Sequence, residues 1–210
     1  MDHLAQEIAK LNEELTSQIP LEILAAFQQS IQELKEKQIE NRSLTIGEKF
    51  PDFNLHNFDH QAVSLQNLLH NKKLIIAFLR GSWCPYCNLE IKALQNEIDK
   101  FKNTKLIVVT PQTEKANLEW HLQHNTSFEI LTDKNNQLAQ KVGIDFKLQD
   151  FVIPYYENLG IDLPQINQIQ NHSLPIPAVY ILDKNGTIMY KFVNANYMER
   201  ININELIKHI

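Results

Sequence analysis

The stretch that decides the fold reads LIIAFLRGSWCPYC and occupies residues 74–87. Its first six residues, 74–79, are all apolar, as expected of a central strand that is covered on both faces. A helical pattern follows over residues 85–102, and its apolar residues share one face: Leu89, Ile91, Leu94 and Ile98. Cys84 and Cys87 therefore stand where a buried strand passes into a helix.

These two cysteines are the only ones in the chain, and their position predicts reactive chemistry. Cys84 falls at the helix N-cap and Pro85 at the first helical position, where a missing N–H costs no intrahelical bond. The free N–H groups and the positive end of the helix dipole lower the pKa of a thiol placed there. We therefore predict that Cys84 is the attacking thiolate and that Cys87, one turn further in, resolves the product.

Two other interpretations of the cysteine pair stay open. The cysteines could pack in the core without reacting, or they could form half of a metal site, since zinc requires four ligands. The best further ligands are His121 and His124, but their spacing is shorter than that of a zinc finger. We expect these histidines on an exposed helix face, and we expect neither a metal nor a cofactor.

Composition and charge exclude several classes of protein. The 210 residues carry a net charge of -5, with acidic and basic residues mixed along the chain, which argues against binding to nucleic acid. No window holds the 18 or more apolar residues of a membrane span, and the N-terminus lacks the apolar core of a signal peptide. A single C-x-x-C is not the cysteine framework of a small secreted domain. We expect a cytoplasmic protein with neither nucleic acid nor membrane among its partners.

Residues 1–43 are predicted to form a helical arm in front of a main domain at 44–210. One face of a first helix is marked by apolar residues three and four apart: Leu4, Ile8, Leu11 and Leu15. Beyond Pro20, the same spacing marks a second helix: Leu24, Phe27, Ile31 and Leu34. The arm either packs on the main domain or joins two copies in a homodimer, and the repeats are too few to indicate a coiled coil.

From residue 44 onward, short strands alternate with helices. The expected strands cover 53–55, 62–64, 74–79, 106–110, 130–131, 178–182 and 187–193. The expected helices cover 65–69, 85–102, 111–125, 135–142 and 202–209, and residues 144–174 are expected to be irregular. Parallel strands joined by helices, followed by an antiparallel hairpin, predict an α/β fold with a central mixed sheet flanked by helices. A C-x-x-C at the first strand-to-helix junction makes this fold thioredoxin-like.

Three stretches carry a resemblance to a known family: residues 46–55 with 63–65, residues 78–87, and residues 174–183 with Gly186. Together they resemble the peroxiredoxin-like branch of the alkyl hydroperoxide reductase/thiol-specific antioxidant family, within the thioredoxin superfamily. The resemblance covers about residues 44–210. It implies a thiol-dependent antioxidant enzyme.

The chain also departs from that family. Typical peroxiredoxins carry Pro-x-x-x-Thr-x-x-Cys, but Ala77 and Gly81 stand at the proline and threonine positions, with the hydroxyl of Ser82 nearby. They also place an arginine where this chain has Pro177. Thioredoxins have a cis proline there, against the C-x-x-C, and the C-P-Y-C motif itself is similar to glutaredoxins. The scaffold thus resembles peroxiredoxins and the site resembles thioredoxins.

Each supporting residue has a functional and a structural interpretation. Arg80 either holds the Cys84 thiolate or points to solvent, and Trp83 either borders the substrate or fills the core. Pro177 is either the cis proline of a thioredoxin-like site or a trans proline before a strand. Arg200 lies in Tyr-x-x-Arg, a tail common in the peroxiredoxin-like branch, and is the other candidate cation.

We therefore predict reduction of hydrogen peroxide or organic hydroperoxides through a Cys84 sulfenic acid, which Cys87 converts to a disulfide. The alternative is a thioredoxin- or glutaredoxin-like thiol–disulfide oxidoreductase without significant peroxidase activity. A third reading is a binding protein with a redox-sensing or metal-binding pair. Both enzymatic routes require an external thiol reductant, such as thioredoxin, glutaredoxin or glutathione.

Overall fold

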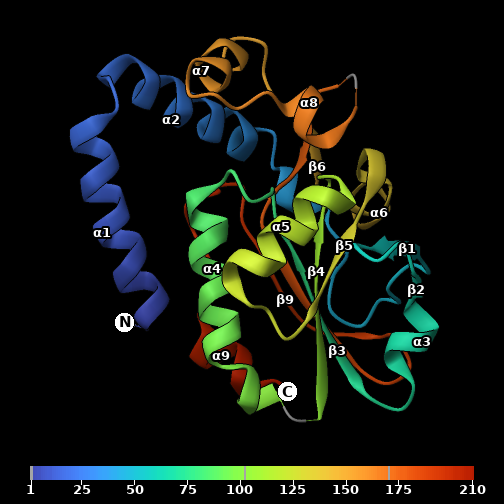
Figure 1. The fold of residues 1–210 in the computed structure, drawn as a ribbon. Helices are drawn as coiled ribbons and strands as arrows, with labels where there is room; N and C mark the ends of the chain where they lie inside the picture. The colour runs from blue at the N-terminus through green and yellow to red at the C-terminus, as the bar shows by residue number, and fades with distance from the viewer. Residues whose placement is uncertain (1, 102, 170) are drawn as a thin grey trace.

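The central feature of the fold is a seven-stranded mixed sheet with the strand order β2-β1-β5-β4-β3-β8-β9 (Figure 1). A computed structural model describes residues 2–101, 103–169 and 171–210 of the chain. The strands of this sheet are β1 (Asn54–Asn57), β2 (Ala62–Ser64), β3 (Lys73–Phe78), β4 (Thr104–Thr110), β5 (Glu129–Thr132), β8 (Ala178–Leu182) and β9 (Ile188–Val193). A second, two-stranded sheet pairs β6 (Asp145–Lys147) with β7 (Ser173–Pro175).

Strand directions follow from the connections. β3, β4 and β5 run parallel, because helices carry the chain from the end of one strand to the start of the next. β8 runs antiparallel to β3, and β9 returns beside β8 in a hairpin. The hairpin turn is closed by Asp183, whose Oδ1 accepts hydrogen bonds from Asn185 N and Thr187 N, both at 2.8 Å. The predicted thioredoxin-like α/β fold with a mixed sheet is confirmed.

Alternating side chains of β3 face two separate cores. Leu74, Ile76 and Phe78 point into one core, shared with side chains of α3 (Leu65–Leu69) and α6 (Gln137–Val142). The neighbouring side chains belong to the second core, under α4 (Pro85–Asn96), α5 (Glu114–His124) and α9 (Ile203–Lys208): Ile75, Ala77 and Leu79. Every residue of 74–79 is at most 1 % exposed, which confirms the predicted strand with two buried faces.

Several boundaries differ from the sequence prediction. The helix expected over 85–102 ends at Asn96, and a separate 3-10 turn follows it at Ile98–Phe101. Two further 3-10 turns cover Ile39–Arg42 and Lys134–Asn136. The stretch expected to be irregular, 144–174, holds short regular elements: β6, α7 (Ile153–Asn158), α8 (Leu163–Asn167) and β7. These elements have three to six residues each, too few to show a hydrophobic period in the sequence.

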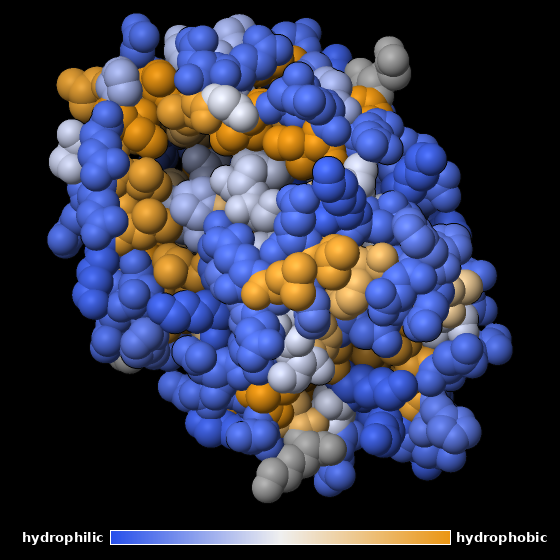
Figure 2. All heavy atoms as spheres, viewed as in Figure 1, coloured by the Kyte–Doolittle hydropathy of each residue, from blue (hydrophilic) through white to orange (hydrophobic). Residues whose placement is uncertain are grey.

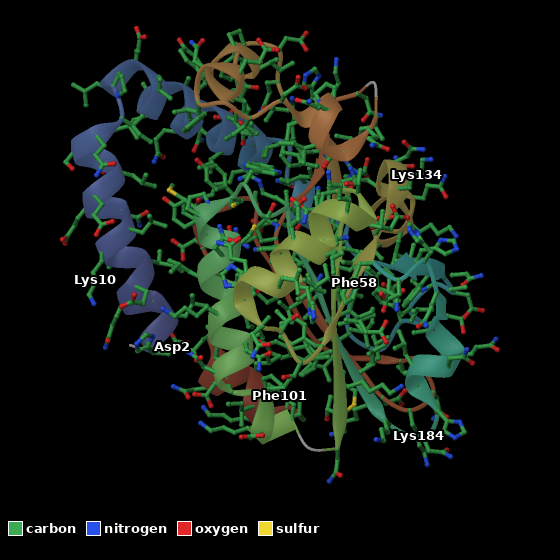
Figure 3. All side chains as sticks on the ribbon, in the orientation of Figure 1. Asp2, Lys10, Phe58, Phe101, Lys134 and Lys184 are labelled. Atoms are coloured by element: carbon green, nitrogen blue, oxygen red, sulfur yellow. The ribbon has the colours of Figure 1, made fainter. Side chains whose placement is uncertain are left out.

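The predicted helical arm consists of α1 (His3–Gln18) and α2 (Leu21–Glu36), separated at Pro20. α1 packs along α4, and α2 crosses above it beside α7 (Figure 1). Asp2 anchors the start of the arm: its carboxylate accepts hydrogen bonds from Ala5 N at 2.9 Å and from Ile203 N of α9 at 2.8 Å. Figure 3 labels Asp2 at the end of α1 that lies beside α9. The arm therefore packs on its own chain, while the division of the chain at residues 43 and 44 stays a prediction.

Within residues 2–101, 103–169 and 171–210, no helix has the length and apolar character needed to cross a membrane.

Candidate active site at the start of α4

Both cysteines lie at the first turn of α4, as the sequence predicts. Cys84 is the N-cap residue, with extended backbone angles, and its carbonyl accepts the hydrogen bond of Asn88 N at 3.1 Å. Pro85 occupies the first helical position. Cys84 and Cys87 are both reduced and buried, with exposed fractions of 1 % and 0 %, and they lie one helical turn apart. The geometry places one sulfur above the other at the amino end of a helix.

The loop that precedes Cys84 is held in place by hydrogen bonds between Ser82 and side-chain amides. Ser82 N and Ser82 Oγ both donate to Gln112 Oε1, at 2.9 and 3.2 Å. Gln112 is oriented by Asn117, whose Oδ1 accepts from Gln112 Nε2 at 2.8 Å. Asn88 Nδ2 donates to Ser82 O at 2.9 Å from inside α4. The Ser82 hydroxyl thus secures the loop through Gln112.

Arg200 reaches the cysteines from the far end of the chain. Its side chain is fully buried, and its Nη2 lies 3.5 Å from Cys87 Sγ and 3.8 Å from Cys84 Sγ. Its Nη1 donates to Glu90 Oε2 at 2.8 Å. Glu90 follows Cys87 by one turn of α4, so the same helix face presents both sulfurs and the carboxylate that holds the arginine.

Arg80 is the second buried cation, and the structure turns it away from solvent. It is 3 % exposed and donates a hydrogen bond to the hydroxyl of Tyr156, which α7 supplies. Its guanidinium lies over three aromatic rings, 4.2 Å from the centroid of Tyr197, 4.7 Å from Trp83 and 5.8 Å from Tyr156. Such cation–π contacts stabilise a desolvated guanidinium.

These surroundings separate the acidities of the two thiols. Burial alone would raise the pKa of Cys84, but the hydrogen bond from Cys87 and the charges of Arg80 and Arg200 outweigh it and lower that pKa to about 5. Burial and the adjacent Cys84 thiolate raise the pKa of Cys87 well above its ordinary value. At neutral pH, Cys84 is therefore the thiolate and Cys87 the thiol.

Two predicted supporting residues lie close by. Trp83 is half-buried, and its ring packs edge to face against Tyr156 with 5.7 Å between centroids. Pro177 borders a small space together with Arg80 and Tyr197. Of the two alternatives for Pro177, the trans proline before a strand is the one found, because the described residues contain no cis peptide bond. The chain enters β8 already extended, with Ile176 N bonded to Ile144 O at 2.8 Å, and an extended segment needs only the ordinary trans bond.

The two histidines that the sequence offers as further metal ligands, His121 and His124, have other partners. His121 Nδ1 lies 2.7 Å from Thr126 Oγ1, and its ring stacks on Phe58. His124 packs edge to face against Trp120. Both are half-buried, so the expectation of an exposed helix face is wrong. Among the described residues, no three His, Cys, Asp or Glu side chains gather as a metal site would require.

A cavity of about 440 Å³ leads to Cys84. Cys87 lies behind Cys84 and does not belong to its lining. The hollow lies between the N-terminal helices and the body of the molecule, with orange apolar side chains on its left and upper sides and paler ones on its right (Figure 2). A molecule that enters this cavity meets Cys84 before it meets Cys87.

Comparison with known proteins agrees with this geometry. Residues 46–191 match the model of the AhpC/TSA family. The chain belongs to the AhpC/TSA family. Over 99 residues it is 33 % identical to a putative peroxiredoxin bcp of Helicobacter pylori strain J99, an alignment that covers 46 % of this chain and 64 % of that protein. Over 164 residues it is 24 % identical to a putative chloroplastic peroxiredoxin Q of Oryza sativa subsp. indica, covering 77 % of this chain and 64 % of that protein. The chain thus spans slightly less than two thirds of these relatives.

A solved structure shows the same fold. The peroxidoxin BcpB of Mycobacterium tuberculosis superposes with a TM-score of 0.62 at 10 % identity, covering 79 % of this chain and 96 % of that one. The matched family range ends before Arg200 and begins after the N-terminal arm. Two parts of the site therefore lie outside the AhpC/TSA match: one buried cation and the helices that face Cys84 across the cavity.

Sequence reasoning missed several residues of this AhpC/TSA site. Glu90 had a usable signal, because it is an acidic residue on the apolar face of α4, one turn beyond Cys87. Tyr197 had one as well, because it is the tyrosine of the Tyr-x-x-Arg tail that ends in Arg200. Tyr156 had none, since it belongs to a segment without a clear period. Gln112 follows a buried strand directly, a place where polar side chains often serve a site, but nothing in the sequence connected it with Ser82.

Proposed function

We propose that this chain is a thiol peroxidase in which Cys84 reduces a hydroperoxide. The observation that carries the proposal is the position of Cys84 Sγ. It lies at the amino end of α4, 3.8 Å from Arg200 Nη2, with its pKa lowered to about 5, and it faces the cavity. Two relatives of the chain are named peroxiredoxins, which supports the same activity.

The reaction balances in two steps. The Cys84 thiolate attacks one peroxide oxygen, an S–O bond forms as the O–O bond breaks, and the departing alkoxide or hydroxide takes a proton from solvent to leave as an alcohol or water. The sulfur of Cys84 is then a sulfenic acid. The Cys87 thiol attacks that sulfur, the S–O bond breaks, and water leaves as the Cys84–Cys87 disulfide forms. An external dithiol, or two monothiols in succession, returns the pair to the reduced state.

Arg80 and Arg200 supply the charge that this reaction needs. Negative charge develops on the departing oxygen, and fixed cations in a water-poor site stabilise it more strongly than water does. The missing family arginine is thereby replaced: Pro177 occupies its position in the sequence, while Arg200 occupies a place beside the sulfurs. Arg80 Nε and Trp83 Nε1 are buried and have no hydrogen-bond partner within the described part of the chain, so both can donate to a peroxide oxygen.

A second candidate activity is thiol–disulfide exchange. The two sulfurs sit on one helical turn and contact each other, so a mixed disulfide at Cys84 would meet Cys87 directly. Peroxide reduction is the stronger proposal, because Arg200 lies 3.8 Å from Cys84 Sγ and Arg80 lines the same cavity as Cys84, so two cations are available to a departing oxyanion. Thiol–disulfide exchange releases a thiolate, which depends less on such stabilisation.

The deciding experiment is stopped-flow tryptophan fluorescence of the reduced protein, mixed in turn with hydrogen peroxide, cumene hydroperoxide and a small aromatic disulfide. Trp83 adjoins Cys84 and reports its oxidation. We expect a fast phase with a hydroperoxide that is absent from Cys84→Ser. Cys87→Ser should keep this phase, lose steady-state turnover with thioredoxin as reductant, and accumulate a dimedone-reactive sulfenic acid. A disulfide that reacts much faster than either hydroperoxide would replace the peroxidase proposal with the exchange activity.

The remaining parts of the proposal concern partners and place. Thioredoxin, glutaredoxin and glutathione are the candidate reductants, and all three fit a cytoplasmic protein, where thiols are kept reduced. A homodimer through the N-terminal helices is also proposed, with exposed Leu21 at its contact, since the arm turns most of its other apolar side chains toward its own chain. Sedimentation of the wild type and of Leu21→Lys tests the dimer, which the lysine should dissociate.

A further inference from the structure

The N-terminal arm forms one whole wall of the cavity that leads to Cys84. Both of its helices contribute to the lining: Asn12, Leu15, Thr16, Ile19, Leu24, Phe27 and Gln28. On the opposite side stand Trp83, Tyr156 and the Cys84 sulfur. The cavity therefore exists only because the arm is folded against the body of the molecule.

The arm is held in that position by specific contacts. Tyr86, directly within the C-P-Y-C motif, donates its hydroxyl to Asn12 Oδ1 of α1 at 2.6 Å. Ser30 of α2 donates to Gln149 Oε1 at 2.7 Å, and the ring of Phe27 packs edge to face on Tyr156 at 5.6 Å. The wall is thus a built part of the folded chain and is joined at both of its helices.

The size and chemistry of the cavity exceed what hydrogen peroxide requires. A water molecule has a share of about 30 Å³ in the liquid, and hydrogen peroxide is only slightly larger, whereas the cavity measures about 440 Å³. The arm contributes four apolar side chains to its lining, Leu15, Ile19, Leu24 and Phe27, and such apolar surface adds nothing to the binding of a small polar molecule. The charged and N–H groups gather at the other end, around Arg80 and Cys84.

We propose that the α1–α2 arm is a specificity element that selects hydroperoxides with a bulky apolar substituent. The peroxide group lies at Cys84 and Arg80, and the substituent lies against Leu15, Ile19 and Leu24. This inference rests on the proposed peroxidase function. It adds a substrate-selecting role for residues outside the 46–191 segment that matches the family.

The test narrows the cavity and measures selectivity. Leu24→Trp and Thr16→Trp place a large ring in the cavity from two different helices, and Gln32→Trp is the matched control, because Gln32 is exposed on α2 and does not line the cavity. For each protein, kcat/KM is measured with cumene hydroperoxide and with hydrogen peroxide. We expect the ratio of the two values to fall at least about tenfold in both cavity variants and to stay at the wild-type value in the control.

A second measurement does not depend on turnover. Cumyl alcohol, the alcohol formed from cumene hydroperoxide, should occupy the same cavity and slow alkylation of Cys84 by iodoacetamide. Protection in the wild type and in Gln32→Trp, with loss of protection in Leu24→Trp and Thr16→Trp, supports the inference. An unchanged ratio in both cavity variants, or no protection of the wild type, overturns it. If neither hydroperoxide oxidises Cys84 while cumyl alcohol still protects it, the peroxidase function fails and the apolar binding site stands.

Discussion

Replacing Arg200 with methionine is the most direct test of how this site produces a thiolate. The substitution keeps an unbranched side chain of similar length and removes the guanidinium 3.8 Å from Cys84 Sγ. The thiolate then loses one of its two cationic neighbours, while Arg80 and the amino end of α4 remain. We expect the pKa of Cys84 to rise from its value of about 5.

The size of the rise follows from Coulomb's law. Unit charges 3.8 Å apart interact with roughly 4 kcal/mol at an effective dielectric constant of about 20, which corresponds to about 3 in pKa. Glu90 offsets part of this effect, because its carboxylate already pairs with Arg200 at 2.8 Å. We therefore expect the pKa of Cys84 in Arg200→Met to lie near about 7.

The assay follows thiolate absorbance near the ultraviolet edge, or the rate of iodoacetamide alkylation, across pH 4 to 10. Arg200→Lys keeps a cation and should hold the pKa of Cys84 close to the wild-type value. Arg200→Met combined with Glu90→Gln removes the whole ion pair and keeps the net charge of the site, so the rise in the pKa of Cys84 should be smaller than in the single variant. Above about pH 9, Cys84 is fully a thiolate in the wild type and in Arg200→Met, so their alkylation rates can be compared directly.

Peroxide kinetics at that high pH separate two roles of Arg200. The thiolate fraction is then equal in the wild type and in Arg200→Met, so a remaining rate deficit measures lost stabilisation of the departing oxygen. Removing one such donor typically costs about 10²–10³ in rate. If Arg200→Met titrates within about 0.5 of the wild-type pKa and keeps its peroxide rate, the reasoning is refuted, and Arg80 with the helix terminus must be sufficient.

Two further predictions concern stability. Gly81 has φ +141°, and a Cβ there would lie 2.6 Å from Trp83 Nε1 and 2.8 Å from Gln112 Oε1. Gly81→Ala should therefore lower the free energy of unfolding, measured by urea denaturation, by about 2–4 kcal/mol. Gly160→Ala is the control, because Gly160 also has positive φ but nothing within 4 Å of the new Cβ, and a loss as large as that of Gly81→Ala would contradict the steric argument. The lowered pKa of Cys84 also makes the stability of the reduced protein depend on pH: the thiolate contributes fully above the unfolded-state pKa of about 8.5, and this contribution is lost as pH falls to about 5. The unfolding free energy of the reduced wild type should therefore exceed that of Cys84→Ser by an amount that grows from pH 5 to pH 9, on the order of 5 kcal/mol. If this difference does not change with pH, Cys84 is not a stabilised thiolate.

Much of the fold is readable from local sequence because its signals are periodic. The continuous apolar run 74–79 predicts a doubly covered strand, and a regular stripe predicts the helix after it. The position of the reactive pair is equally local. The reactive pair follows a buried strand and stands at the start of a helix, at Cys84, Pro85 and Cys87. Because the first turn of every helix has free N–H groups, local sequence is enough to place such groups beside Cys84. The sequence by itself therefore determines where the nucleophile stands and supplies one source of its acidity, the helix terminus.

The tertiary structure alone decided what surrounds that nucleophile. Arg200 is 116 residues from Cys84 along the chain, and Tyr156 is 76 residues from Arg80, yet each pair is in contact. The tertiary structure also decided that the bond before Pro177 is trans and that the arm packs over Cys84. Periodicity records which face of an element is buried, but it holds no information on which distant segment covers that face. Only the complete path of the chain brings a second cation to the sulfur and closes an apolar wall around it.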